Sequence, residues 1–389
     1  MMVSDKRMDL RKFVAPEFIF GSGALSLVGR YAVNFGASNV FVVSDSGVIN
    51  AGWTGKVTRC LEEEGLPYTV FSNVTPNPRA EEVMQGAAVY RQEGCDIIIA
   101  VGGGSPIDCA KGVGVVSTNN RNVMDFEGVD QIPVPGPPLI CVPTTAGSSA
   151  DVSQFAIITD MRSRRKAALV SKMLVPDTSL IDPDTTMTMP ADLTANTGLD
   201  ALTHGIEAYV SNASSTITDL FALNAVRLIR SNLPGALHEP GNSEYRTSMM
   251  LGSLEAGLAF SNASLGATHA MAHSLGGVED TAHGESNAAL LVPVIEFNYD
   301  TLPQRYEKIG EAMGLNFAEL SHAEKKSALV NTITGLIREC GAKQRLRDFG
   351  VSRENIPELA RKALKDACMV TNPRQMSQKE VEMIYERAL

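Results

Sequence analysis

Short apolar runs alternate with helical patterns between residues 38 and 182, and no other feature of the sequence restricts the fold as strongly. Residues 39–45, 68–74 and 96–105 contain such runs, with the length and the β-branched composition of buried strands. Residues 56–64 and 79–93 lie between them and repeat apolar side chains at helical spacing. This alternation predicts an α/β domain with a parallel sheet.

The pattern of strands continues to about residue 184 and changes beyond Pro190. Residues 138–145, 155–160 and 179–184 are predicted strands that continue the sheet, the second in a hairpin with residues 161–171. Beyond Pro190, helical patterns cover residues 193–212, 218–233, 244–262, 318–340, 356–370 and 377–389. We therefore expect an α/β domain over residues 1–185 and an all-helical domain over residues 186–389, with prolines at 183 and 190 near the boundary.

The composition favours a small molecule as partner over nucleic acid or a membrane. The 389 residues carry a formal charge of −10, and lysine and arginine are spread along the chain, so we expect no basic patch for phosphate backbones or anionic lipids. The first dozen residues mix charges without the apolar core of a signal peptide, and no run approaches a membrane span. Six scattered cysteines without a CxxC pair suit free thiols in a reducing cytoplasm.

A glycine-rich segment follows the strand predicted at residues 96–101. It reads Gly102, Gly103, Gly104 and Ser105, and a helix is predicted directly after it. Ser105 is a suitable N-cap, Pro106 fits the first helical position, and Asp108 can complete a capping box. Glycines leave main-chain N–H groups accessible and a helix N-terminus attracts anions, so this segment can hold a pyrophosphate. A tight turn without a ligand explains the same residues, because the segment is not the GxGxxG fingerprint.

Two further strand ends carry side chains suited to a dinucleotide. Thr144, Thr145 and Ser148 follow the strand at residues 138–143, and ligands of open α/β sheets bind at such carboxyl ends. Asp45 ends the first strand, and its carboxylate can accept hydrogen bonds from a ribose diol and repel a 2′-phosphate. This favours NAD over NADP. An N-cap role in the next helix is the alternative for Asp45.

Histidines and one aspartate in the second half supply the donors of a divalent metal site. Asp200 and His204 are four residues apart in a predicted helix, as are His269 and His273, and His283 follows ten residues later. Three imidazoles and one carboxylate suit Fe2+ or Zn2+, which would lower the pKa of an alcohol and polarise an aldehyde. These five candidates exceed the four ligands required, so one should have another role. Alternatively, some of the histidines cap helices or bond backbone carbonyls.

Long stretches of the chain resemble the iron-containing (group III) alcohol dehydrogenases. The resemblance runs nearly end to end, through residues 73–78, 100–112, 142–160, 200–204, 260–277, 282–293 and 371–374, in the correct order. It implies a dinucleotide-binding N-terminal domain, an all-helical metal-binding C-terminal domain and catalysis in the cleft between them.

The resemblance also implies roles for individual residues. Asp200, His204, His269 and His283 match the metal ligands, and His273 matches the catalytic histidine near the nicotinamide and the substrate. Nucleotide contacts fall on Asp45, Gly102, Gly103, Gly104, Ser105, Asp108, Thr144, Thr145, Ser148 and Lys166. Phe155 and Phe260 fall where side chains line the substrate pocket.

Three positions depart from the family pattern. Asp151 stands where the family usually has glutamate, and residues 280–282 lack the proline that usually precedes the ligand His283, a loss that would loosen its loop. Glu285 stands where many relatives have an aliphatic residue. We expect the Glu285 carboxylate to be solvated, the alternative being a contact with the cation.

These observations predict an NAD-dependent alcohol dehydrogenase with Fe2+ or Zn2+ as its metal, which transfers hydride between NAD(H) and a short primary alcohol or aldehyde. A polyol dehydrogenase or a dehydroquinate-synthase-like enzyme of the same superfold is one alternative, although those relatives typically hold the metal with fewer histidines. A non-catalytic metal-binding or nucleotide-binding protein is another. We expect a cytoplasmic homodimer or higher homo-oligomer with no nucleic-acid or membrane partner.

Overall fold

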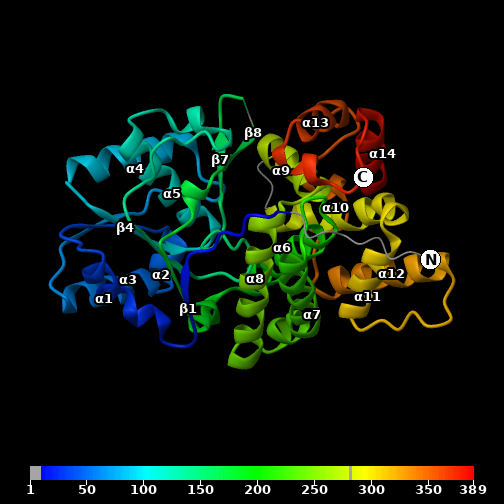
Figure 1. Ribbon diagram of the computed structural model, residues 1–389, viewed down its shortest axis with the longest axis horizontal. Helices are drawn as coiled ribbons and strands as arrows, with labels where there is room; N and C mark the ends of the chain where they lie inside the picture. The colour runs from blue at the N-terminus through cyan, green and yellow to red at the C-terminus, as the bar shows by residue number, and fades with distance from the viewer. Residues whose placement is uncertain (1–9, 164, 280–282) are drawn as a thin grey trace.

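The computed structural model describes residues 10–163, 165–279 and 283–389, which form an α/β half and a helical half (Figure 1). Every strand named within these residues lies between Glu17 and Ile181, and long helices follow from Ala191 onward. The predicted fold class, a parallel α/β region followed by a helical region, is confirmed. The domain boundary between residues 185 and 186 stays a prediction.

The main sheet of the described chain has six strands in the order β1-β9-β6-β4-β2-β3, and all neighbouring pairs are parallel. The strands are β1 (Glu17–Phe20), β2 (Val40–Val43), β3 (Tyr68–Phe71), β4 (Ile97–Gly102), β6 (Leu139–Pro143) and β9 (Thr178–Ile181). Gly102 pairs with Pro143, so the loops that follow β4 and β6 leave the sheet at the same level. The sheet therefore presents these two loops side by side.

Helices cover both faces of this sheet. They are α1 (Val28–Asn34), α2 (Ser46–Asn50), α3 (Trp53–Glu63), α4 (Ala80–Gln92) and α5 (Gly104–Asn119). Alternate strand residues face opposite layers: Val40 and Val42 pack with α1 and α3, whereas Phe41 and Val43 pack with α4 and α5. Burial on both faces explains why the strands read as continuous apolar runs.

A smaller sheet lies beside the helical half. It contains β5 (Gly128–Val129), β7 (Phe155–Asp160) and β8 (Arg165–Val170), with β7 and β8 antiparallel as the predicted hairpin requires. Helix α9 packs against β8, and Figure 1 shows the two next to each other. This contact joins the two halves of the molecule.

The helical half consists of long helices around one large core and a smaller one. They are α6 (Ala191–Val210), α7 (Thr216–His238), α8 (Ser243–Ala263), α9 (Ala267–Glu279), α10 (His283–Asn298), α11 (Pro303–Ala312), α12 (His322–Glu339), α13 (Ile356–Ala363) and α14 (Gln378–Ala388). The helix predicted over residues 356–370 is too long. Helix α13 ends at Ala363, and a 3-10 helix, η7 (Ala367–Thr371), follows because the Asp366 side chain caps it by accepting from the Cys368 N–H, 2.8 Å.

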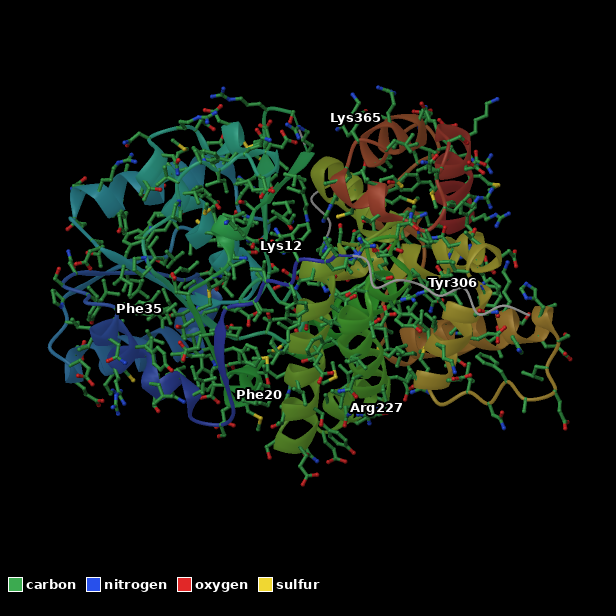
Figure 2. The ribbon with its side chains drawn as sticks, in the orientation of Figure 1. Lys12, Phe20, Phe35, Arg227, Tyr306 and Lys365 are labelled. Atoms are coloured by element: carbon green, nitrogen blue, oxygen red, sulfur yellow. The ribbon has the colours of Figure 1, made fainter. Side chains whose placement is uncertain are left out.

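Helix α6 is the central helix of this half. It packs against α7, α8 and α10, and most of its residues from Gly198 onward are buried. Figure 2 marks Tyr306 in the helical half, Phe35 in the α/β half and Lys12 where the N-terminal segment passes between them. None of the helices in the described part of the chain has the length and apolarity that a membrane crossing requires.

Candidate active site

A cavity of about 750 Å³ is lined by residues from both halves of the molecule. Loops after β2, β4 and β6 contribute to it, together with the β7–β8 hairpin and helices α6, α8, α9 and α10. The predicted site residues that line it are Asp45, Gly103, Gly104, Ser105, Asp108, Thr144, Thr145, Ser148, Phe155, Lys166, Asp200, His204, Phe260, His269, His273 and His283. The remaining predicted residue, Gly102, ends strand β4 directly before this lining. Residues predicted for nucleotide, metal and substrate thus meet at one cavity.

The glycine segment is packed tightly against its surroundings. The Thr144 N–H donates to the Gly102 carbonyl, 2.9 Å. Gly102 has a φ of +152°, and a β-carbon there would stand 2.6 Å from Cγ of Pro106. A β-carbon at Gly104 would stand 3.0 Å from the Ser148 side chain. Glycine is therefore required at residue 102, whereas a side chain at residue 104 would press on Ser148, and the glycines leave the main-chain N–H groups accessible.

Helix α5 starts two residues earlier than predicted. Gly103 is its N-cap residue and Gly104 its first residue, so the predictions of Ser105 as N-cap and Pro106 as first residue are wrong. The reason is the extended conformation of Gly103, with φ −80° and ψ −159°, which lets the helix begin within the glycines. The Ser105 hydroxyl instead accepts from the Asn77 N–H, 3.3 Å. Among the described residues no side chain caps α5, so its first N–H groups can bind an anion.

Asp108 faces strand β7 and not the helix N-terminus, so the predicted capping box is wrong. Its Oδ2 accepts from the Ile157 N–H, 3.0 Å, while its buried Oδ1 has no hydrogen-bond partner within the described chain. Burial raises the pKa of Asp108 to about 6, although Lys111 and the Ile157 N–H oppose this rise. Lys111 is buried nearby and donates to the carbonyls of Ser153, 2.8 Å, and Phe155, 2.7 Å. The loop after β4 therefore has a buried polar support.

Two more of the predicted nucleotide residues have defined contacts. Asp45 caps α2, because its Oδ1 accepts from the Val48 N–H, 2.9 Å, and the carboxylate also lines the cavity. Asp45 therefore caps α2 and still contributes its side chain to the lining of the cavity. Lys166 on β8 donates to Oδ1 of Asn77, 2.8 Å. Its ammonium group places a positive charge in the lining of the same cavity.

The predicted metal ligands converge from three helices. Asp200 and His204 share one face of α6, His269 lies on α9, and His283 begins α10. The Nε2 atoms of His204, His269 and His283 lie 3.9, 3.5 and 3.7 Å from Oδ1 of Asp200. The His204 and His269 rings are stacked, with centroids 4.5 Å apart. The donor atoms of Asp200, His269 and His283 all lie within 4.8 Å of one another, and His204 adjoins this group through its contact with Asp200. One carboxylate and three imidazoles have the donor chemistry that fits Fe2+ or Zn2+.

A close helix–helix approach brings His283 to this cluster. A β-carbon at Gly284 would stand 2.2 Å from the carbonyl oxygen of Asn196 on α6. Glycine therefore lets the first turn of α10 contact the backbone of α6. Residues 280–282, where the usual proline is missing, lie outside the described residues, so the predicted loosening of this loop stays a prediction.

Burial and mutual contacts set the protonation state of each group in the cluster. Burial would raise the pKa of Asp200, but His204, His283 and His269 outweigh it and hold that pKa far below its usual range. Burial lowers the pKa of His204 to about 4 and that of His283 well below its ordinary value, so both rings are neutral near pH 7. Burial also opposes charge on His269, but its hydrogen bonds with Asp200 and Glu207 raise its pKa to about 9. A cation bound here must displace that proton.

Glu207 is a functional candidate that we did not predict from the sequence. It is 4% exposed and accepts hydrogen bonds from the N–H groups of Gly266 (3.1 Å), Thr268 (2.7 Å) and His269 (3.3 Å) at the start of α9. Its Oε2 also accepts from Nδ1 of His269, 2.7 Å, which directs Nε2 of that ring towards Asp200. Helical spacing in the sequence could have indicated this residue, because Glu207 lies seven residues after Asp200 on the same face of α6.

Asp366 is a second candidate that the sequence did not indicate. Its Oδ2 accepts from Nδ1 of His273, 2.8 Å, and its Oδ1 caps η7. Burial would raise the pKa of Asp366, but the charge and hydrogen bond of His273 lower it. Asp366, His273 and Cys368 also form a second group of possible metal donors in the described chain. Since 93 residues separate Asp366 from His273, local spacing could not have paired them.

An apolar wall lies beside the metal cluster. The rings of Phe155 and Phe260 meet edge to face, with centroids 5.8 Å apart, and Phe260 stacks on His204 at 4.3 Å. Leu265 and Cys368, which we did not predict, line the same cavity. This wall suits the carbon chain of a small substrate.

The two described departures from the family pattern lie outside the cluster. Asp151 is buried, and its Oδ2 accepts from the Ser179 hydroxyl, 3.0 Å. The carboxylate of Glu285 is 3.8 Å from Nζ of Lys343, and Glu285 does not belong to the described lining of the cavity. This placement agrees with the expected position of Glu285 away from the cation.

Comparison with known proteins identifies the family. Residues 15–183 match the family model of the iron-containing alcohol dehydrogenases, and residues 194–389 match that of the C-terminal part of the same family. The chain therefore belongs to the iron-containing alcohol dehydrogenases, as the sequence predicted. It is an oxidoreductase of the alcohol dehydrogenase class.

Individual relatives are similar over almost their whole length. The chain is 40% identical to 1,3-propanediol dehydrogenase of Klebsiella pneumoniae over 95% of this chain and 96% of the relative. It is 36% identical to lactaldehyde reductase of Escherichia coli (strain K12) over 95% and 97%. A crystal structure of 1,3-propanediol oxidoreductase superposes with a TM-score of 0.95 and 38% identity, covering 98% of this chain and 100% of that one.

Proposed function

We propose that this protein transfers hydride between NAD(H) and a short primary alcohol or its aldehyde in the cavity between its two halves. One observation carries the proposal: the glycine segment, the Asp–His cluster and His273 all line a single cavity. Hydride transfer needs the nicotinamide and the substrate carbon in contact, and a shared cavity supplies that proximity.

We propose that Asp200, His204, His269 and His283 hold the iron, with zinc as a possible substitute. The cation supplies Lewis acidity, which lowers the pKa of the alcohol and polarises the aldehyde carbonyl. The chain supports this by keeping two of the three imidazoles neutral and by fixing the third through Glu207. Phe155 and Phe260 form the apolar wall for the substrate carbons.

His273 is the proposed proton-transfer residue. Oxidation of an alcohol gives one hydride to the nicotinamide and releases one proton from the hydroxyl. Asp366 accepts from Nδ1 of His273, so Nε2 is the ring atom left to exchange the proton with the substrate. The two rings of His273 and His283 are stacked with centroids 5.2 Å apart, so His273 stands beside the metal cluster.

The other end of the proposed reaction site binds the dinucleotide. Uncapped N–H groups at the start of α5 suit a pyrophosphate, and Thr144, Thr145 and Ser148 offer hydroxyls at the neighbouring strand end. The Asp45 carboxylate suits the ribose diol of NAD and disfavours a 2′-phosphate.

A substrate panel tests this function. Apoprotein is loaded with Fe2+ under anaerobic conditions or with Zn2+, and short alcohols and aldehydes are assayed with NAD(H) and with NADP(H) by absorbance at the wavelength of the reduced nicotinamide. We expect turnover of primary alcohols or aldehydes with NAD(H) that depends on added metal. Stoichiometric NAD binding without turnover on any panel member would overturn the proposal.

We further propose a cytoplasmic homo-oligomer, a dimer or larger. All six cysteines lie in the described part of the chain and are free, as suits a reducing compartment. Strand β1 is at the edge of the six-stranded sheet and exposes 40% of Phe18, a surface that a second copy can cover. Light scattering of the purified protein measures the oligomeric state.

A further inference from the structure

Asn287 lies among the proposed metal ligands although no role has been assigned to it above. It is fully buried, with 0% exposure, and stands one helical turn after His283 on α10. Its Nδ2 is 2.6 Å from Oδ1 of Asp200, 3.1 Å from Nε2 of His269 and 3.3 Å from Nε2 of His283. The carboxamide thus touches three of the four proposed ligands at their donor atoms.

The chemistry of this contact is specific. A carboxamide nitrogen carries two N–H donors. The Asp200 carboxylate oxygen accepts one of them at 2.6 Å, and a neighbouring imidazole nitrogen with a free lone pair can accept the other. The other end of the group, Oδ1, is buried and has no hydrogen-bond partner among the residues that the structure describes. An unpaired buried carbonyl is destabilising, so its retention here needs a compensating role.

We propose that Asn287 is a positioning residue of the metal centre that sets its affinity for a divalent cation. The inference rests on the proposed ligand set. Through Nδ2, Asn287 donates to the Asp200 carboxylate and contacts Nε2 of both His269 and His283, so it fixes the relative positions of these three groups. Its neutral side chain also leaves Asp200 as the only anion that contacts this carboxamide within the described chain, so the charge of the centre depends on this position.

We expect two substitutions at Asn287 to change Zn2+ affinity in opposite directions. Asn287→Leu keeps the branched shape of the side chain but removes the contact to Asp200, and we expect Zn2+ affinity to fall about 10–100-fold, as for other groups that orient metal ligands. Asn287→Asp places a second carboxylate against Asp200. Because a divalent cation relieves their repulsion and affinity follows the number of charged ligands, we expect Zn2+ affinity to rise about tenfold or more. A purely structural role would weaken binding in both variants.

The measurement is chelator competition for Zn2+ with purified apoprotein, without any assay of turnover. Asn232→Asp and Asn232→Leu are matched controls, since Asn232 lies on α7 and its amide donates to the Leu228 carbonyl, 2.7 Å. Both should keep wild-type affinity. Circular dichroism checks folding, and Asn287→Ser replaces the leucine variant if that variant does not fold; it too should bind Zn2+ more weakly.

The outcomes separate this inference from the proposed function. Weaker binding by Asn287→Leu with tighter binding by Asn287→Asp supports it. Wild-type affinity in both variants, or equal weakening in both, overturns it while the proposed ligands stand, provided that His283→Ala loses Zn2+. If His283→Ala retains wild-type affinity, the ligand assignment fails and this inference fails with it.

Discussion

Replacing Glu207 by glutamine tests how the buried carboxylate prepares the metal centre. Glu207 accepts three backbone N–H groups and Nδ1 of His269 at the start of α9. Glutamine is isosteric, but it has a single acceptor oxygen and no charge. If that oxygen takes the place of Oε2, the NH2 group faces the Thr268 N–H, which is now 2.7 Å from Oε1. One charge-assisted bond is lost and two buried donors face each other.

The magnitude follows from these contacts. A hydrogen bond to a charged group contributes about 1.5–3 kcal/mol and an unsatisfied buried donor costs about 1–3 kcal/mol. We therefore expect Glu207→Gln to lower the free energy of unfolding of the apoprotein by about 3–5 kcal/mol, within the range for breaking a buried ionic contact. Weaker orientation of His269 should also reduce Zn2+ affinity about 10–100-fold.

Urea denaturation gives the first quantity and chelator competition the second. Glu255→Gln is the matched control, because burial raises the pKa of Glu255 and its side chain accepts from Asn224 in a contact outside the metal cluster. It should change neither quantity appreciably. If Glu207→Gln unfolds with the wild-type midpoint and binds Zn2+ as tightly as the wild type, the role assigned to Glu207 is refuted.

Three further predictions concern the same site. Because hydrogen bonds with Asp200 and Glu207 outweigh burial and raise the pKa of His269 to about 9, cation binding displaces one proton, and Zn2+ affinity should rise about tenfold per pH unit between pH 6 and 8; a flat profile in chelator competition would contradict this. Asp366→Asn should leave metal content unchanged while kcat falls about 10–100-fold, since His273 loses the carboxylate that orients it; steady-state kinetics with wild-type kcat would remove Asp366 from the proton path. Gly284→Ala should destabilise the protein by about 2 kcal/mol or more and reduce its metal content, because the added carbon would stand 2.2 Å from the Asn196 carbonyl; an unchanged thermal midpoint and full metal content would show that this contact adjusts freely.

Much of the fold could be predicted because its signals are local. The spacing of apolar residues differs between strands and helices, so β2, β4 and the β7–β8 hairpin could be predicted directly. Strand β1 was missed because four partly exposed residues at a sheet edge give only a weak pattern. The two residues of β5 are a strand only through pairing with β8, which no local pattern shows.

Some residues of the site could likewise be predicted from local spacing, and others could not. The pairs Asp200–His204 and His269–His273 are visible as helical spacing, and the structure places all four at one cavity. Asp366 meets His273, and Asn287 meets Asp200, only through tertiary packing. The start of α5 was misplaced because glycine can adopt extended or helical backbone with similar ease, so the sequence alone did not locate the first turn.

X-ray absorption spectroscopy of the zinc-loaded protein tests the central claim most directly. We predict a first shell made of nitrogen and oxygen donors alone, at about 2.0–2.2 Å, as Asp200, His204, His269 and His283 would supply. The second donor group in the described chain, His273, Asp366 and Cys368, contains a thiol. A sulfur scatterer at about 2.3 Å would place the metal there and contradict the proposed centre.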